Sequence, residues 1–234
     1  KVVFCENNFW GRTISACSSS TDDSCRKGFG PFLPGIEFVP YNNASSLKKK
    51  LESDPNIVAF MLEPIQGEAG VVIPDSGYLQ AVRNLCFEHN VLMIADEIQT
   101  GLGRTGKMLA CDYEKVKPDL LLLGKALSGG TLPVSAVLGN DEVMLTIKEG
   151  EHGSTFGGNP LGSAVAMAAL SVIEEEELDK NAFLMGTLFR NSLKGIPNVQ
   201  VRGKGLLNAL VLSGTNEKFN AYKLCEKMRR AGLL

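Results

Sequence analysis

Apolar and polar positions along the chain predict strands and helices in turn. Four short runs are almost wholly apolar, at 57–62, 91–95, 119–123 and 134–138, and residues 1–4 also have the pattern of a strand. Such runs are typical of strands that are buried on both faces, and these strands are usually parallel. Between the first two runs, helical spacing joins five apolar residues: Tyr78, Leu79, Val82, Leu85 and Cys86. The order strand–helix–strand over 57–95 predicts an α/β sheet.

The expected helix at 78–88 follows Asp75-Ser76-Gly77, and either Asp75 or Ser76 is predicted to cap its first turn. The stretch Gly28–Gly35 predicts a loop. Further helices are predicted at 160–178, with Asn159 as cap and Pro160 in the first turn, and at 181–193. The segment 164–172 is apolar nearly all round, which predicts burial.

A strand at 206–212 and a helix at 218–231 complete the expected elements. Gly195 and Pro197 interrupt the pattern near 194–199. We therefore expect a large domain over 1–195 and the beginning of a second, smaller domain over 196–234. The chain begins inside a predicted strand and without Met, and it stops after Gly232, so an internal piece of a longer protein is expected.

Composition narrows the classes of function. Of 234 residues, 44% are hydrophobic and 21% are charged, which is ordinary for a folded domain. The 24 basic and 26 acidic residues give a net charge of −2, which counts against binding to nucleic acid. No apolar run reaches the roughly 18 residues of a membrane span. Six cysteines are too few for a disulfide scaffold, so we expect cytosol or mitochondrial matrix rather than secretion.

Several familiar motifs are weak in this sequence. Gly101–Gly106 matches the dinucleotide fingerprint by letter, but residues 96–100 separate it from the preceding strand and no amphipathic helix follows. Two histidines and no Cys-x-x-Cys pair give no basis for a metal site, and Gly-x-Ser-x-Gly does not occur. Asn43-Ala44-Ser45 fits the glycosylation sequon, which arises often by chance.

Charged residues directly after two buried strands are harder to dismiss. Asp96 and Glu97 follow the run at 91–95, and Lys125 follows the run at 119–123. In open α/β sheets ligands bind at the carboxyl ends of the strands. Burial there lowers the pKa of a lysine, which favours a neutral amine able to form a Schiff base, and a neighbouring Asp can hold a protonated pyridine nitrogen. The alternative is that these charges only mark strand ends at the surface.

The Gly-rich segment Gly153–Pro160 precedes a predicted helix and contains Ser154 and Thr155. Hydroxyl groups and free backbone N–H groups at a helix start suit a phosphate. A turn that only caps the helix is the alternative.

These segments together resemble the class III pyridoxal-phosphate aminotransferases. The resemblance rests on five motifs in the same order: Phe9–Thr13, Glu63–Glu68, Asp96–Gly101, Gly124–Gly130 and His152–Pro160. It implies the large domain of fold type I, a mostly parallel sheet flanked by helices, with the start of a small α+β domain. Phe9-Trp10-Gly11-Arg12 and the segments 127–130 and 133–137 are most similar to members of the class that use ornithine.

The resemblance implies roles around the cofactor, pyridoxal 5'-phosphate. Lys125 is expected to form the Schiff base and then to carry a proton, and Asp96 to pair with the pyridinium nitrogen. Gln99 is expected to contact the phenolic oxygen, with Phe9 and Ile98 on the two ring faces. Ser154 and Thr155 are expected to hold the phosphate in the neighbouring subunit, which implies a homodimer.

The same resemblance implies substrates and their contacts. Arg12 is expected to bind a substrate carboxylate. Glu68 is expected to be a switch that pairs with a distant arginine, so that one pocket accepts ornithine and 2-oxoglutarate, with Glu63 as a supporting carboxylate. The expected products are glutamate 5-semialdehyde and glutamate. Another class III aminotransferase, acting on acetylornithine or 4-aminobutyrate, and a non-catalytic protein of the same fold are the alternatives.

Two cysteines flank a polar loop close to the Phe9–Thr13 motif. Cys17 and Cys25 lie on either side of Ser18–Ser24. We hypothesise that they form a redox-sensitive pair near the site, against the alternative of two ordinary thiols.

Overall fold

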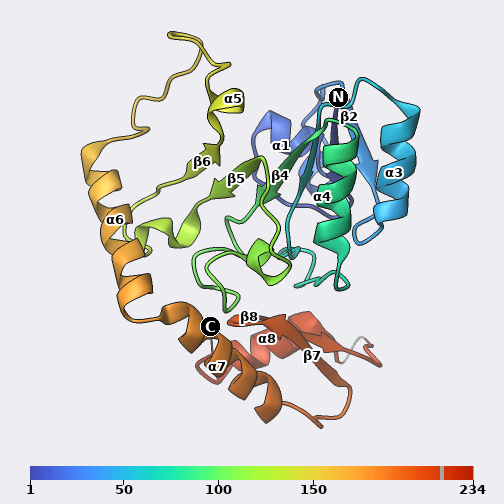
Figure 1. Cartoon of the computed structure of the whole chain (residues 1–234). Coiled ribbons are helices and arrows are strands. Elements are labelled where there is room, and N and C mark those ends of the chain that lie inside the picture. Colours follow the sequence, from blue (N-terminus) through green and yellow to red (C-terminus); the bar gives the residue numbers. More distant parts are fainter. Residues whose placement is uncertain (217–218, 234) are drawn as a thin grey trace.

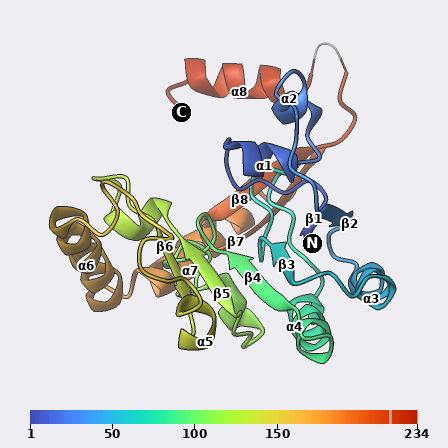
Figure 2. The same ribbon diagram turned by 90° about the horizontal axis from the view of Figure 1, so that it is seen from above.

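A six-stranded sheet forms the body of the molecule in the computed structural model, which describes residues 1–216 and 219–233 (Figure 1). Figure 2 shows the strands in the order β2-β1-β3-β4-β5-β6. Their bounds are β1 Val2–Cys5, β2 Ile36–Val39, β3 Ala59–Leu62, β4 Leu92–Asp96, β5 Leu120–Leu123 and β6 Ala136–Gly139. All neighbouring pairs from β2 to β5 are parallel, as the consecutive apolar runs predict.

Strand β6 differs from the expectation of parallel strands, because it pairs with β5 antiparallel. A parallel neighbour needs a long crossover, usually a helix. The connection at 124–135 holds only the short 3-10 helix η2 (Lys125–Ser128), so the chain turns straight back along β5. Strand β2 was not predicted; it is a short edge strand with three half-exposed residues, so its sequence carries little of the buried pattern.

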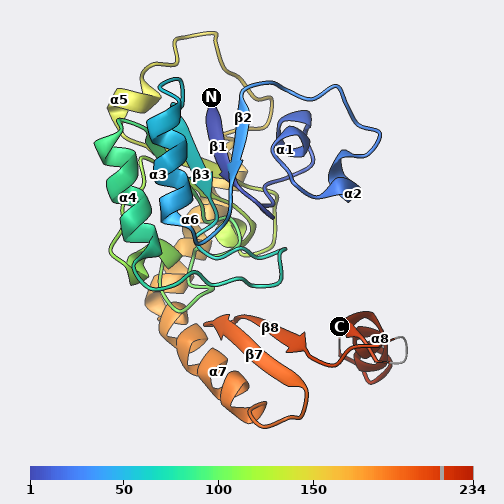
Figure 3. The ribbon, with the colours of Figure 1, turned by 90° about the vertical axis from the view of Figure 1, so that its right-hand side faces the viewer.

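Helices cover both faces of the sheet (Figure 3). The helices α3 (Ala44–Ser53) and α4 (Tyr78–Glu88) lie on one face, and α1 (Ile14–Ser18) and α2 (Asp23–Arg26) lie on the other. Between the sheet and α3 and α4 lies the main core, whose most buried members include Val3, Leu47, Phe60, Val82 and Met93. The sequon residue Asn43 is the cap of α3: its Oδ1 accepts from the Ser46 backbone N–H at 3.0 Å.

The start of α4 corrects the expected cap. Neither Asp75 nor Ser76 caps the helix; its N-cap is Gly77, whose φ is 88°. The Glu114 carboxylate instead accepts from the backbone N–H groups of Gly77 and Gln80, each at 3.0 Å. A residue distant in sequence thus provides the anion that favours a helix N-terminus.

The C-terminal part contains α5 (Asp141–Met144), α6 (Pro160–Glu175), α7 (Leu178–Ser192), the antiparallel hairpin β7 (Val199–Lys204) and β8 (Leu207–Leu212), and α8 (Ala221–Arg230). Asn159 caps α6 as predicted, with Oδ1 accepting from the Gly162 N–H at 2.7 Å. Strand β7 was not predicted. The expected beginning of the last helix at Lys218 lies outside the described residues.

Burial of the apolar segment 164–172 is not observed. Met167 is 70% exposed and Val172 is 43% exposed, while Ile173 packs in a second core with Leu102, Leu123 and Leu127. One side of α6 contacts η2, and nothing among the described residues covers the other. Helix α7 packs on the β7–β8 hairpin. The predicted division into two domains between residues 195 and 196 stays a prediction. No helix among the described residues is long and apolar enough to cross a membrane.

Candidate active site

The ends of β4 and β5 bring Asp96 and Lys125 to one cavity. Asp96 is the last residue of β4, and Lys125 follows β5 after Gly124. The two strands are neighbours and parallel, so their carboxyl ends meet at the same edge of the sheet. The cavity holds about 170 Å³ and is lined by Phe9, Trp10, Gly11, Glu63, Glu68, Asp96, Ile98, Gln99 and Lys125. The structure thus brings together seven of the predicted site residues.

Asp96 is a buried carboxylate with only 5% of its surface exposed. Its Oδ1 accepts from the Ile98 backbone N–H at 3.0 Å. Burial raises the pKa of Asp96 to about 6, against the opposing effects of this hydrogen bond and of the charge on Lys125. A cation placed against this carboxylate offsets the cost of burying it.

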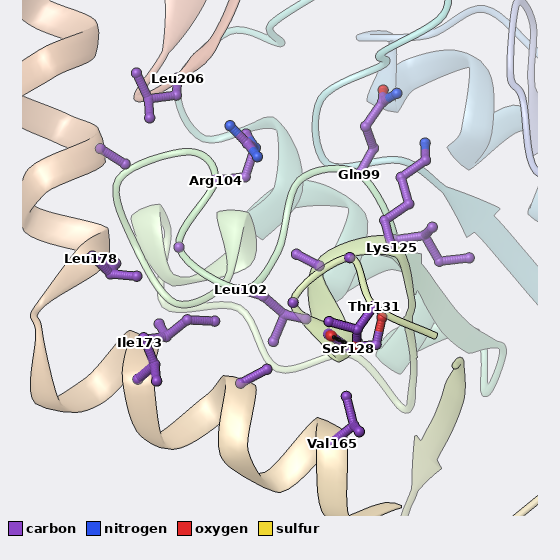
Figure 4. A pocket seen from close by; sticks show the side chains of 18 of the residues that line it. Gln99, Leu102, Arg104, Lys125, Ser128, Thr131, Val165, Ile173, Leu178 and Leu206 are labelled. Carbon is purple, nitrogen blue, oxygen red and sulfur yellow. Dashed lines mark hydrogen bonds between the residues drawn. The ribbon is translucent and has the colours of Figure 1, made fainter. Parts of the chain in front are cut away.

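Lys125 lies on a strained piece of backbone, because its φ is 44°, in the left-handed region. Its side chain is exposed, so these residues do not desolvate it as the sequence predicted. The reason is a groove of about 1300 Å³ that opens beside it. Figure 4 shows Lys125 and Gln99 at one end of this groove and Ile173 and Leu178 at the other.

Gln99 reaches the cavity by passing over a glycine. Its Nε2 donates to Glu68 Oε1 at 3.1 Å. A Cβ added to Gly67 would lie 1.3 Å from Gln99 Oε1 and 2.5 Å from Gln99 Cδ. Gly67 therefore leaves the space that the Gln99 side chain occupies. Sequence reasoning gave Gly67 no role, although it stands directly before Glu68 in the quoted motif.

The Glu63 carboxylate joins two walls of the cavity. Oε1 accepts from the Phe9 backbone N–H at 2.8 Å, and Oε2 accepts from the Gly67 backbone N–H at 3.0 Å. Burial raises the pKa of Glu63 to about 7, and the nearby Asp96 and Glu68 charges act in the same direction. These contacts make Glu63 a support for the Phe9 backbone at the cavity wall.

Arg12 lies at the edge of the site, beyond the residues that line the cavity. Its guanidinium carbon is 5.2 Å from the centre of the Phe9 ring. Its Nη1 donates to Cys25 Sγ at 2.6 Å, and Cys17 Sγ donates to the Arg12 carbonyl oxygen at 3.6 Å. Both cysteines are buried free thiols, and each of them contacts Arg12. The redox-sensitive pair stays a prediction.

Trp10 lines the cavity, although sequence reasoning gave it no role. Its ring stacks on Phe4 at a centroid distance of 5.8 Å, and its Nε1 donates to Ser19 Oγ at 2.6 Å. The available signal was its place next to Phe9 as the single tryptophan of the chain.

Ser154 and Thr155 are not brought to this cavity. Both are exposed in the irregular segment before α6, where Ser154 Oγ accepts from the Gly157 N–H at 3.0 Å. The Gly101–Gly106 segment is a loop after β4 and opens no helix, which agrees with the rejection of the dinucleotide fingerprint.

Comparison with known proteins shows which family the chain belongs to. The model for class III aminotransferases matches residues 1–234. The mitochondrial ornithine aminotransferase of Drosophila melanogaster is 62% identical over 237 residues, which cover 100% of this chain and 54% of that protein.

Solved structures agree with the family. The ornithine aminotransferase of Toxoplasma gondii, whose active site has partial occupancy of PLP, matches with 49% identity and a TM-score of 0.96, over 100% of this chain and 56% of that one. The acetylornithine aminotransferase of Elizabethkingia anophelis matches with 46% identity and a TM-score of 0.84, over the same shares. The chain spans about half the length of these relatives. With its whole length matched and the strand-end lysine and aspartate in one cavity, the chain belongs to the class III aminotransferases.

Proposed function

We propose that the complete protein transfers the δ-amino group of L-ornithine to 2-oxoglutarate, giving glutamate 5-semialdehyde and glutamate. The observation that carries this proposal is the single cavity that joins Lys125, Asp96 and Gln99 to Glu68. The identity of 62% to an ornithine aminotransferase supports ornithine as the amino donor.

The residues of the cavity fit pyridoxal 5'-phosphate, the cofactor of this class. Asp96 is a buried carboxylate with a raised pKa, which a protonated ring nitrogen would neutralise. Phe9 and Ile98 supply apolar surface to a ring, and Gly67 leaves room for the Gln99 amide to reach the ring's oxygen. When bound, the cofactor supplies an aldehyde for the amino group and a ring that withdraws electrons from the reacting carbon.

Lys125 performs the proton transfer in this proposal. Its Nζ would hold the cofactor covalently, and as a free amine it would take the proton from the carbon that bears the transferred amino group. The left-handed backbone at Lys125 and its place after β5 aim the side chain at the cavity. Asp96 keeps the ring nitrogen protonated, so that the ring remains an electron acceptor.

The substrate side has opposite charges, Glu68 in the lining of the cavity and Arg12 at its edge. Arg12 binds a substrate carboxylate next to Phe9, and Glu63 holds the Phe9 backbone in place. Glu68 pairs with a distant arginine while ornithine is bound, and this pair opens when 2-oxoglutarate brings a second carboxylate for the arginine to bind. This charge switch lets one pocket take both substrates.

The proposal includes a homodimer and a cellular location. Ser154 and Thr155 are exposed and away from their own cavity, which supports a homodimer in which they hold the phosphate in the partner subunit. The fly relative is named as a mitochondrial protein, which favours the mitochondrial matrix over the cytosol; fractionation of the cells tests this.

Borohydride reduction of the complete protein, followed by peptide mapping, tests the proposal first. A pyridoxyl group on Lys125 is expected. An unmodified Lys125 in a folded, cofactor-saturated sample would overturn the enzymatic proposal. Substrate profiling with ornithine, acetylornithine and 4-aminobutyrate then tests the donor, because preference for acetylornithine would favour the relation to the Elizabethkingia enzyme instead.

A further inference from the structure

Arg202 connects the C-terminal hairpin to a turn that borders the cavity. Arg202 lies on β7, and its Nε and Nη2 both donate to the carbonyl oxygen of Gly70, at 3.0 Å and 2.6 Å. The two residues are 132 positions apart in the sequence. Two charged donors on one carbonyl fix the position of that peptide unit more narrowly than one donor does.

The turn at 66–72 is tight and its apex faces Arg202. Gln66 and Val72 form a two-way backbone bridge, and the N–H groups of Gly70 and Val71 both donate to the Gly67 carbonyl at 3.0 Å. Gly70 has a φ of 96°, and a Cβ added there would lie 3.2 Å from Arg202 Nη2. The apex thus has the conformation and the space that the approach of Arg202 requires.

The other side of the same turn reaches the cavity. Gly67 receives the Gln99 side chain and donates its N–H to Glu63, and Glu68 accepts from Gln99. A shift of the turn therefore moves Glu68 relative to Gln99. Arg202 itself lines neither the cavity nor the groove.

The hairpin gives Arg202 a firm base. Lys204 is two residues further along β7 and on the same face as Arg202. Its Nζ lies 3.8 Å from the centre of the Tyr113 ring. The Leu206 backbone N–H donates to the Arg104 carbonyl at 2.9 Å. These contacts hold β7 against the loop at 101–113, and Arg202 extends from there to the turn at 66–72.

We propose that Arg202 is a positioning residue, which holds the turn at 66–72 so that Glu68 and Gln99 keep their hydrogen bond at the cavity. The proposal rests on the proposed function for its kinetic consequence. Substrate binding at Glu68 depends on Arg202, although Arg202 touches neither cofactor nor substrate.

The test compares Arg202→Met and Arg202→Lys with Arg190→Met in the complete, cofactor-loaded enzyme. Arg190 is a matched control, because its Nη1 also donates to a glycine carbonyl, that of Gly205, but it does not contact the turn. We expect Arg202→Met to raise KM for ornithine and 2-oxoglutarate by roughly tenfold with a smaller change in kcat, and Arg202→Lys to restore part of the loss. Arg190→Met should leave both KM values near those of the wild type.

Coupling to Glu68 separates positioning from general loss of stability. In a Glu68→Gln background, Arg202→Met should raise KM far less than it does alone, since both substitutions act on the same contact. If Arg202→Met raised KM by the same factor with and without Glu68→Gln, the proposal would be overturned. Equal KM values for Arg202→Met and Arg190→Met would also overturn it.

A second readout does not depend on activity. Hydrogen exchange of the amides of Gly70 and Val71 should speed up in Arg202→Met and stay unchanged in Arg190→Met. A wild-type enzyme that does not use ornithine would overturn the proposed function alone, because the exchange experiment still decides the role of Arg202. Unchanged exchange in Arg202→Met would overturn the positioning role.

Discussion

Gln99 donates a hydrogen bond from its Nε2 to Glu68 Oε1 at 3.1 Å, which links the end of β4 to the turn that follows β3. The resemblance assigns these two side chains to different tasks, the cofactor oxygen for Gln99 and the substrate switch for Glu68. Because the two side chains are hydrogen-bonded, a substitution of either residue should change the position of the other side chain. Gly67 makes the contact possible by leaving the space that Gln99 crosses.

Gly67→Ala should displace Gln99. The added Cβ would overlap Gln99 Oε1 and Cδ, and a flexible side chain end moves more readily than the backbone. We expect a stable protein with weaker cofactor binding, by about tenfold, because a hydrogen bond to the ring is lost. Cofactor titration followed by absorbance measures the effect.

The control for this prediction is the background Gln99→Ala. If Gly67→Ala acts through Gln99, it should change cofactor affinity little once the Gln99 side chain is gone. A full additional loss in that background would contradict the assignment.

Asp96→Asn should weaken cofactor binding by about 2 kcal/mol or more, which is roughly 30-fold, because a buried charge pair loses one partner. The raised pKa of Asp96, about 6, also sets a pH dependence. Binding a cationic ring nitrogen requires the ionised carboxylate, so affinity should fall as the pH drops through about 6. Titrations between pH 5 and pH 8 check this, and the variant should lack that step.

Glu63 should make the cofactor-free protein less stable as the pH rises. Its pKa is raised from 4.5 to about 7 by burial, so the folded state binds the proton more tightly than the unfolded state does. The stabilisation from protonated Glu63 is complete below the unfolded value of 4.5 and is lost as the pH rises through about 7. The size of this change is on the order of 3 kcal/mol.

Urea unfolding of the wild type and of Glu63→Gln at several pH values measures this change. The difference in unfolding free energy between the two proteins should vary between about pH 4.5 and pH 7. The wild type should become less stable relative to Glu63→Gln as the pH rises. Parallel curves would show that Glu63 does not titrate in this range.

Lys125→Ala should remove transamination while the fold stays intact. General acid–base catalysis supplies about 10²–10⁴-fold in rate, and the covalent bond to the cofactor is lost as well. Lys107→Ala is a control, since Lys107 is an exposed lysine of the loop at 101–109 and lines neither cavity nor groove. Activity assays with circular dichroism check both variants, and substantial turnover by Lys125→Ala would contradict the role.

Cys17 and Cys25 should form a disulfide if they are a redox pair. Diamide would take up the two protons and two electrons that the thiols give up. Counting thiols before and after oxidation should show a loss of two, and none in Cys25→Ser. Since Cys25 accepts a hydrogen bond from Arg12, oxidation should also raise KM. An unchanged thiol count would end the hypothesis.

Most of the sheet could be predicted from the sequence because its strands are buried on both faces. The runs that became β3, β4 and β5 carry the consecutive apolar pattern that such burial imposes. The edge strand β2 and the hairpin strand β7 are partly exposed, so their patterns were too weak to detect. Helix α6 shows the opposite error, since its apolar sequence predicted a burial that these residues do not provide.

For the site, the sequence by itself predicted which residues share one cavity and are proposed to carry the chemistry. Lys125 and Asp96 stand directly after buried strands, and the parallel order of β4 and β5 brings them to one edge. Glu63 was predicted as a supporting carboxylate, but only the tertiary structure decided that it contacts the Phe9 backbone, that Gly67 makes room for Gln99, and that Arg202 contacts Gly70. These contacts join segments far apart in the chain, and their geometry depends on packing, which no local pattern of residues records.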